Sequence, residues 1–349
     1  MLKPLKVAVL SSAPRCICAV FLLASALCAA GAEHNNRMLH IPAGAFMMGD
    51  GHDVGGRDER PAHRVSLSAF WMDRLEVSNA DMRDVMQWAF DNGHVRVETN
   101  GVFNVHGAPR ELLDGDDWNA EIHFKDDRFT VLQGRDTFPC IEVTWFGALA
   151  YANFRSLREG LAPCIDLVDW HCTFRADGYR LPSEAEWERA ARGGLEGHHY
   201  PWASPGEKYW EPVRGRHANF WGSDDAYENE AGYNLSTPVG YYNGEQRPAG
   251  VVMTNGYGLM DMTGNVEEWC WDVYNDDEYR KERALQKDPV GPAGGSYRVV
   301  RGGSWITGQK EAWAEKSIKS QRYHLRIADR TRRDPGRGQH FRGFRCVRR

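Results

Sequence analysis

Alternating and helix-periodic apolar positions mark a few short elements in the first half of the chain. Residues 39–49 predict short strands that end at glycines. Residues 63–70 alternate polar and apolar side chains, as a half-buried strand does. A helix follows, because Ser78 and Asp81 form a capping-box pattern ahead of an apolar face that ends near Gly93. That face comprises Met82, Val85, Met86, Ala89 and Phe90.

The same signals predict two further helices. The first is stopped by Gly160, and its apolar positions are Phe146, Leu149, Ala150, Phe154 and Leu157. The second begins after Ser183, which forms a capping box with Glu186, and it ends at Gly193.

The remaining sequence has few periodic stretches and predicts loops. Residues 94–139 indicate loops with short strands, and residues 194–349 are rich in Gly, Asn and Trp. The 349 residues include 36 Gly, 16 Pro and 13 Trp, while 26% charged and 42% hydrophobic residues exclude a disordered, collagen-like or coiled-coil chain. We therefore expect one compact, loop-rich α+β domain over residues 33–349.

The N-terminus predicts export. Lys3, Lys6 and Arg15 precede an apolar run over residues 17–27, and residues 30–32 offer an Ala-Gly-Ala cleavage site. The run is shorter than the roughly 20 residues that a membrane span needs, which argues against the alternative of an uncleaved anchor. We expect a signal peptide over residues 1–32 and a periplasmic or secreted protein without membrane insertion after cleavage.

Five cysteines remain after that cleavage, an odd number for an oxidising compartment. Cys164 and Cys172 lie eight residues apart across a predicted loop, so a local disulfide between them is expected. The pairing of Cys140, Cys270 and Cys346 stays open, and one thiol is left over.

Charge is distributed unevenly along the chain. The formal net charge of −5 gives no basic field for nucleic acid, yet residues 310–349 are strongly basic. This tail either docks on the acidic remainder or forms a site for an anionic ligand. Internal pairing is expected for most of its arginines, with one or two left as a substrate clamp; the candidates are Arg326, Arg330, Arg332, Arg333 and Arg337.

Common catalytic motifs are missing, but several sequence blocks resemble a known family. The chain has no G-x-G-x-x-G, Walker, H-E-x-x-H or G-x-S-x-G motif. Blocks at residues 41–49, 76–79, 143–145, 179–188, 255–269, 301–305 and 343–346 stand in the order of the formylglycine-generating enzyme family, also called the sulfatase-modifying factor family. The resemblance implies a single loop-rich domain with little regular secondary structure, distantly similar to C-type lectins.

The resemblance also implies two structural calcium ions. Such a hard cation prefers carboxylate and carbonyl oxygens. The positions that match the second calcium site are Asp261, Gly264, Val266 and Glu268. The positions that match the first site, where the loop spacing differs, are Asn219, Phe220, Asp225 and Tyr227.

The family's copper centre is not matched. Its enzymes bind copper(I) through two cysteines shortly after the Gly-Gly-Ser block, and here Thr307 and Ala312 occupy those positions. No cysteine lies between Cys270 and Cys346 to replace them. Ser304 is retained, whereas an asparagine common in the family is missing near Phe341.

Three functions remain open. The first is an oxidative modifying or maturation enzyme with a different active centre and an unidentified redox metal, similar to the exported homologue in pyoverdine maturation. The second is a non-catalytic module that binds a peptide or glycan, and the third is formylglycine formation itself, which the substitutions oppose. Unidentified peptides, proteins and small molecules, anionic ones included, are candidate partners. Candidate catalytic residues are Ser304, Thr307 and Glu267, and further candidate cleft residues are Trp305, His324 and the C-terminal arginines.

Overall fold

The computed structural model describes residues 38–98, 101–202, 213–228, 235–308 and 323–349. The expected signal segment over residues 1–32 and the position of Ala312 lie outside this description. The chain divides into two units, Met1–Met38 and Leu39–Arg349. Of the described residues, 18% are helical and 23% lie in strands, which confirms the loop-rich α+β expectation. Within these residues, no helix combines the length and apolar character needed to cross a membrane.

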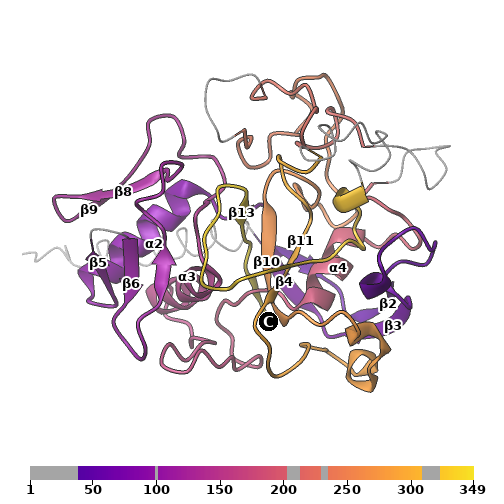
Figure 1. Ribbon diagram of the computed structural model, residues 1–349, viewed down its shortest axis with the longest axis horizontal. Coiled ribbons are helices and arrows are strands. Elements are labelled where there is room, and N and C mark those ends of the chain that lie inside the picture. Colours follow the sequence, from indigo (N-terminus) through magenta and orange to yellow (C-terminus); the bar gives the residue numbers. More distant parts are fainter. Residues whose placement is uncertain (1–37, 99–100, 203–212, 229–234, 309–322) are drawn as a thin grey trace, which may run out of the picture. The chain divides into compact units, whose positions relative to one another are not determined.

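A four-stranded sheet forms the centre of the domain (Figure 1). Strand β10 (Glu267–Val273) lies between β11 (Arg298–Arg301), which runs antiparallel to it, and the parallel β13 (Arg342–Gly343). Strand β12 (Thr331–Arg333) pairs with the outer side of β11. Segments from residues 267–349 therefore meet in one sheet.

Three α-helices occur in the described residues, at the positions predicted from sequence. Helix α2 (Asn79–Asp91) begins with the Ser78–Asp81 capping box, and α3 (Trp145–Arg158) is capped by Thr144. Helix α4 (Glu184–Arg192) carries the Ser183–Glu186 capping box and ends at Gly193, which has φ of +58°. A positive φ favours glycine, so this helix end is encoded locally.

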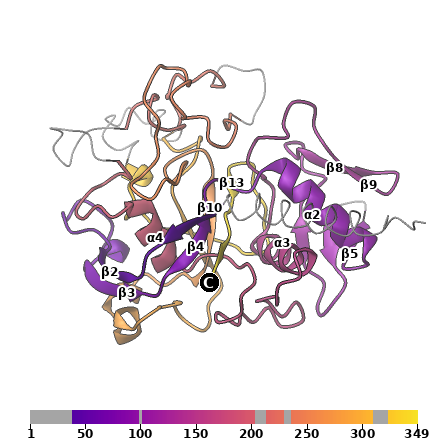
Figure 2. The same cartoon turned by 180° about the vertical axis from the view of Figure 1, so that it is seen from behind.

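The other strands form small sheets on either side of β10. Strands β1 (Met38–Ile41), β4 (Phe70–Asp73) and β14 (Val347–Arg348) pair in one sheet, and β2 (Gly44–Met48) pairs with β3 (His63–Leu67). The segment that lacked periodicity forms β5 (Val95–Glu98), β6 (Gly101–Asn104), β7 (Glu111–Leu113), β8 (Ile122–Lys125) and β9 (Arg128–Val131). These five strands gather with α2 and α3 on one side of β10, whereas α4, β2 and β3 lie on the other (Figures 1 and 2).

Buried tryptophans join these parts, because each places an indole N–H on a specific acceptor. Trp145 donates to the Cys270 carbonyl at 2.9 Å, and Trp269 donates to the Val143 carbonyl at 3.1 Å. Trp187 donates to Oε2 of Glu268 at 2.8 Å. The aromatic residues therefore contribute both buried apolar area and fixed orientation to the core.

The expected disulfide between Cys164 and Cys172 is not formed. All five described cysteines are buried free thiols. Cys172 pairs with Ile165 in a β-bridge, and the Thr173 N–H donates to the Cys164 carbonyl at 2.8 Å. The two cysteines are therefore staggered rather than opposite, and the Cys164 thiol contacts the Gly178 carbonyl at 3.2 Å instead.

Candidate functional site

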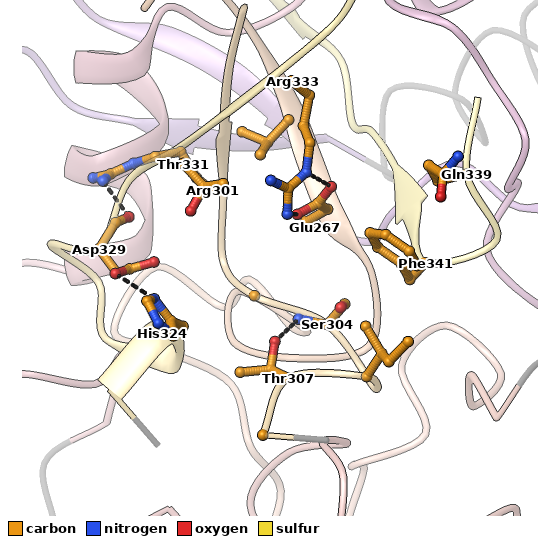
Figure 3. Close-up of a pocket in the computed structure, with 14 residues that line it drawn as sticks. Glu267, Arg301, Ser304, Thr307, His324, Asp329, Thr331, Arg333, Gln339 and Phe341 are labelled. Carbon is orange, nitrogen blue, oxygen red and sulfur yellow. Dashed lines mark hydrogen bonds and ion pairs between the residues drawn. The ribbon is translucent and has the colours of Figure 1, made fainter. Parts of the chain in front are cut away.

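A cleft of about 560 Å³ opens beside the central sheet and contains all three candidate catalytic residues (Figure 3). Its walls come from β10, β11 and β12, from the turn after β11, and from the segment ahead of β13. The lining side chains that carry polar groups are Glu267, Arg301, Ser304, Thr307, His324, Asp329, Thr331, Arg333 and Gln339. Ser304, Thr307 and Glu267 thus line one cleft, and their catalytic role stays a prediction.

The turn after β11 is held by hydrogen bonds between Ser304 and Thr307. The Ser304 N–H donates to Thr307 Oγ1 at 2.9 Å, and the Thr307 N–H donates to the Ser304 carbonyl at 2.9 Å. Gly303, at φ of +70°, packs so closely that an added Cβ would lie 2.7 Å from the His324 carbonyl oxygen. The Thr307 hydroxyl therefore stabilises the turn, which is a structural role for a residue predicted to be catalytic.

Trp305 lies behind this turn. The residue is buried, its N–H donates to the Asn265 carbonyl at 2.8 Å, and its indole Nε1 donates to the His340 carbonyl at 3.2 Å. Trp305 does not line the cleft, but its hydrogen bond to His340 supports the segment in which Gln339 and Phe341 do.

Glu267 is a buried acidic residue of the cleft and binds two arginines. Arg333 donates to both of its carboxylate oxygens at 2.8 Å, and Arg342 Nε donates to Oε1 at 2.6 Å. The Glu267 side chain is 6% exposed, while that of Arg333 is 34% exposed. Two guanidinium groups share the Glu267 carboxylate, so these three side chains together carry an excess of positive charge, and Arg333 is the one of the two arginines that lines the cleft.

A second polar pair lies across the cleft. His324 Nδ1 is 3.1 Å from Asp329 Oδ1, and the histidine side chain is 50% exposed (Figure 3). An imidazole held by a carboxylate has the chemistry to exchange protons with a ligand bound in the cleft.

Most of the C-terminal arginines are paired inside the domain, as expected. Arg326 binds Glu59 through two contacts at 2.7 and 2.8 Å, and Arg330 binds Glu184 at 2.6 and 2.8 Å. Arg332 is exposed, with its guanidinium over Tyr274 at 5.5 Å. Arg337 is 79% exposed and lies 3.7 Å from Asp334. Among these arginines, only Arg333 lines the cleft.

Two of the residues that match the second calcium site, Asp261 and Glu268, lie near the buried Arg345. Glu268 accepts hydrogen bonds from Arg345 and Trp187 on both carboxylate oxygens. Asp261 Oδ2 accepts from the Gly240 N–H at 2.6 Å, and burial raises the pKa of Asp261 to about 6. Burial and the nearby Asp261 and Glu268 carboxylates raise the pKa of Glu76 well above its usual range. Asp261 fits a hard cation, whereas Glu268 already has charged donors, so calcium at Asp261, Gly264, Val266 and Glu268 stays a prediction.

The residues that match the first calcium site lie in one loop region. Asn219 Nδ2 donates to the Leu235 carbonyl at 2.8 Å, and the Phe220 carbonyl accepts from the Ser223 N–H at 3.0 Å. The Asp225 carboxylate accepts from Ser223 Oγ at 2.7 Å and from the Tyr227 N–H at 2.8 Å. Asp225 is buried, and this burial raises its pKa. Its oxygens suit calcium chemically, and the assignment of Asn219, Phe220, Asp225 and Tyr227 likewise stays a prediction.

Sequence reasoning missed a third group of acidic residues. Asp114, Asp117 and Glu142 place one carboxylate oxygen each within 4.8 Å of one another, an arrangement able to hold a metal ion. Burial, followed by the charges of Asp117 and Asp114, raises the pKa of Glu142 to about 8. The acidic run at residues 114–117 was a readable signal, but Glu142 lies far away in sequence and joins it only in the fold.

Comparison with known proteins identifies the family. The sulfatase-modifying factor enzyme 1-like domain matches residues 24–349. The formylglycine-generating enzyme of Thermomonospora curvata is 32% identical over 334 residues, which cover 89% of this chain and 92% of that protein. Serine/threonine-protein kinase Pkn1 of Chlamydia trachomatis is 34% identical over 311 residues, covering 89% of this chain but 38% of the kinase. The chain thus spans well under half the length of Pkn1.

Solved structures share the fold. Treponema denticola variable protein 1 superimposes with a TM-score of 0.58 at 24% identity, covering 89% of this chain and 94% of its own. PvdO from Pseudomonas aeruginosa gives a TM-score of 0.55 at 25% identity, covering 89% and 93%. The chain therefore belongs to the sulfatase-modifying factor enzyme 1-like family, the formylglycine-generating enzyme family that its sequence blocks resemble.

Proposed function

We propose that this family member binds an anionic peptide or small molecule in the cleft, without a copper dithiolate. The observation that carries the proposal is the excess of positive charge around Glu267, which Arg333 and Arg342 share. Arg333 is the more exposed of the two arginines, since its side chain is 34% exposed and that of Arg342 is 3% exposed. A ligand carboxylate or sulfate would gain charge-assisted hydrogen bonds from Arg333.

The missing thiolates support a departure from the formylglycine reaction. Thr307 occupies one matching position, and its hydroxyl accepts the Ser304 N–H rather than facing a metal. The cysteines of the described residues are buried, and none of them lines the cleft. The undescribed residues 309–322 contain no cysteine in their sequence either.

The adjacent arginines of β12 supply a matched test of anion binding. Arg333→Ala removes the cleft guanidinium, whereas Arg332→Ala removes the neighbouring one that lies over Tyr274, away from the cleft lining. Citrate and an acetylated glutamyl peptide serve as probes in titrations at low and high salt. Arg333→Ala should weaken binding roughly tenfold, as expected for one charge-assisted bond, and reduce its salt dependence. Equal effects of both variants, or no binding by the wild type, would refute the proposal.

A second candidate function is a modifying enzyme with a different active centre, which the His324–Asp329 pair in the cleft favours. In that reaction His324 would move a proton to or from a ligand bound at Arg333. Metal analysis separates the two functions, because a redox metal bound in the cleft in near-unit stoichiometry favours the enzyme. Calcium alone favours a binding module.

The setting we propose is the periplasm or the extracellular space. The proposal rests on the charged, apolar and Ala-Gly-Ala pattern of residues 1–32. Mass spectrometry of exported protein should give a mature chain that starts at Glu33. Intact Met1 in the exported fraction would contradict this processing.

A further inference from the structure

The acidic group behind the cleft is assembled by two distant segments. Asp114 follows β7 and Glu142 precedes α3, and the bridge between Leu113 and Val143 brings these segments together. The Asp114 N–H donates to the Glu142 carbonyl at 3.0 Å, which fixes the two backbones relative to each other. The carboxylate oxygens of Asp114, Asp117 and Glu142 consequently converge within 4.8 Å.

An unpaired carboxylate oxygen of Glu142 independently points to a bound ion at this group. Its side chain is only 3% exposed, and its buried Oε1 atom accepts no hydrogen bond. Leaving a carboxylate oxygen unpaired in the interior is costly. The neighbouring Arg342 cannot serve it fully, because its guanidinium donates to Glu267 and to the Arg337 carbonyl.

His340 stands beside the group from a third segment. Its Nδ1 atom lies 3.8 Å from Glu142 Oε1, too far for a hydrogen bond but close enough for both atoms to reach one cation between them. Burial lowers the pKa of His340, which favours the neutral imidazole that can coordinate a cation.

We propose that Asp114, Asp117 and Glu142 bind a divalent cation, with His340 within reach as a fourth ligand. Three carboxylates suit hard cations such as Ca²⁺ and Mn²⁺, and the imidazole suits Mn²⁺ better than Ca²⁺. This group is separate from the residues that match the two family calcium sites, and the proposal is independent of the anion bound at Arg333.

A cation here would stiffen the wall of the cleft. The His340 ring lies 5.6 Å from the Trp305 ring, and Gln339 and Phe341 on either side of it line the cleft. Tying His340 to Glu142 through the ion therefore fixes the segment that separates the acidic group from the cleft.

Ion counting on variants tests the site. Chelator-treated protein is dialysed to equilibrium against Ca²⁺ or Mn²⁺, and bound ions per chain are measured for wild type, Glu142→Gln and Asp116→Asn. Asp116 is an exposed carboxylate in the same loop that hydrogen-bonds Asp114 but contributes no oxygen to the converging group, so it controls for the negative charge of the loop. We expect Glu142→Gln to lose one ion per chain, or to bind it at least tenfold more weakly, and Asp116→Asn to retain it.

Each result decides the proposal. Unchanged ion number and affinity in Glu142→Gln would overturn it, as would an equal loss in Asp116→Asn or the absence of binding by the wild type. If Glu142→Gln does not fold, Asp117→Asn replaces it in the same comparison, because Asp117 is partly exposed. A preference for Mn²⁺ that disappears in His340→Ala would assign the imidazole as a ligand, and unchanged Mn²⁺ binding in His340→Ala would remove it from the set.

Discussion

Arg345 and Glu268 form a buried ion pair between β10 and the segment that follows β13. Arg345 Nη2 lies 2.6 Å from Glu268 Oε1, and the two side chains are 0% and 1% exposed. Arg345 also donates to the carbonyls of Asp73, Arg74 and Met260, so one guanidinium connects four separate segments. Such a pair contributes to the specificity of packing, and removing one partner leaves an uncompensated buried charge.

Arg345→Met should therefore destabilise the domain by about 3–5 kcal/mol. The double variant Arg345→Met/Glu268→Gln should recover part of this loss, because it removes the stranded carboxylate charge. Urea unfolding at equilibrium measures both values. Arg83→Ala is the control, since its ion pairs with Asp84 and Asp136 are exposed and should contribute at most about 1 kcal/mol. If Arg345→Met were as stable as Arg83→Ala, the Arg345–Glu268 ion pair would not contribute to the stability of the domain.

Calcium should raise the melting temperature of the chelated protein, because an ion that binds the folded chain stabilises it by mass action. Asp261→Asn should remove part of this response, since Asp261 is the buried carboxylate of the second predicted site that accepts a hydrogen bond from the Gly240 backbone N–H rather than from an arginine. Differential scanning fluorimetry with and without Ca²⁺ measures the effect. An identical response in Asp261→Asn would exclude that carboxylate as a ligand, and no response in the wild type would exclude both predicted sites.

The helices can be predicted from sequence because the signals that start and end them are local. Ser183, Glu186 and Gly193 lie within a few residues of one another, so capping and the left-handed end of α4 are properties of a short peptide. The same reasoning missed β10. Its residues Glu267–Val273 are nearly all buried on both faces, which removes the alternation that identifies a half-exposed strand.

The sequence indicates which residues meet in the cleft but not which side chains pair there. Ser304, Thr307 and Glu267 were recognised through the family blocks, yet the two arginines of Glu267 lie 66 and 75 residues away. Glu142 joins Asp114 only through a bridge between β7 and the start of α3. Side-chain partners at such separations depend on topology, which residue spacing alone does not specify.

Asp272 should make stability fall as pH rises. Burial and the Glu184 charge raise its pKa to about 8, whereas the unfolded chain releases this proton near its usual value of 3.8. Between those values the folded state holds more protons, so the free energy of unfolding decreases with increasing pH. In Asp272→Asn this contribution disappears, and the variant should gain stability relative to the wild type on going from about pH 5 to about pH 8. Urea unfolding across this range measures it. Asp91→Asn, which alters an exposed helix end, should follow the wild type, and parallel curves for Asp272→Asn would contradict the prediction.

The wild-type protein should not convert a Cys-x-Pro-x-Arg peptide to formylglycine with copper(I), oxygen and reductant. Thr307 offers a neutral hydroxyl that already accepts the Ser304 N–H, and Ala312 has no ligand atom. Copper(I) requires soft donors such as thiolates. Mass spectrometry of the peptide measures the reaction, and the mass of an aldehyde at more than trace turnover would contradict this prediction.

Restoring the thiolates provides the converse test. Thr307→Cys/Ala312→Cys should bind one copper(I) ion per chain in a competition assay with a chromogenic chelator, because two thiolates form a linear soft-donor site. Thr307→Cys alone should bind copper(I) far more weakly, since a single thiolate lacks its partner, and it also controls for loss of the hydrogen bond to Ser304. Equal copper(I) affinity in the wild type and the double variant would mean that the cleft does not bring these two positions together. In that case the match of Thr307 and Ala312 to the family's cysteine pair would be wrong.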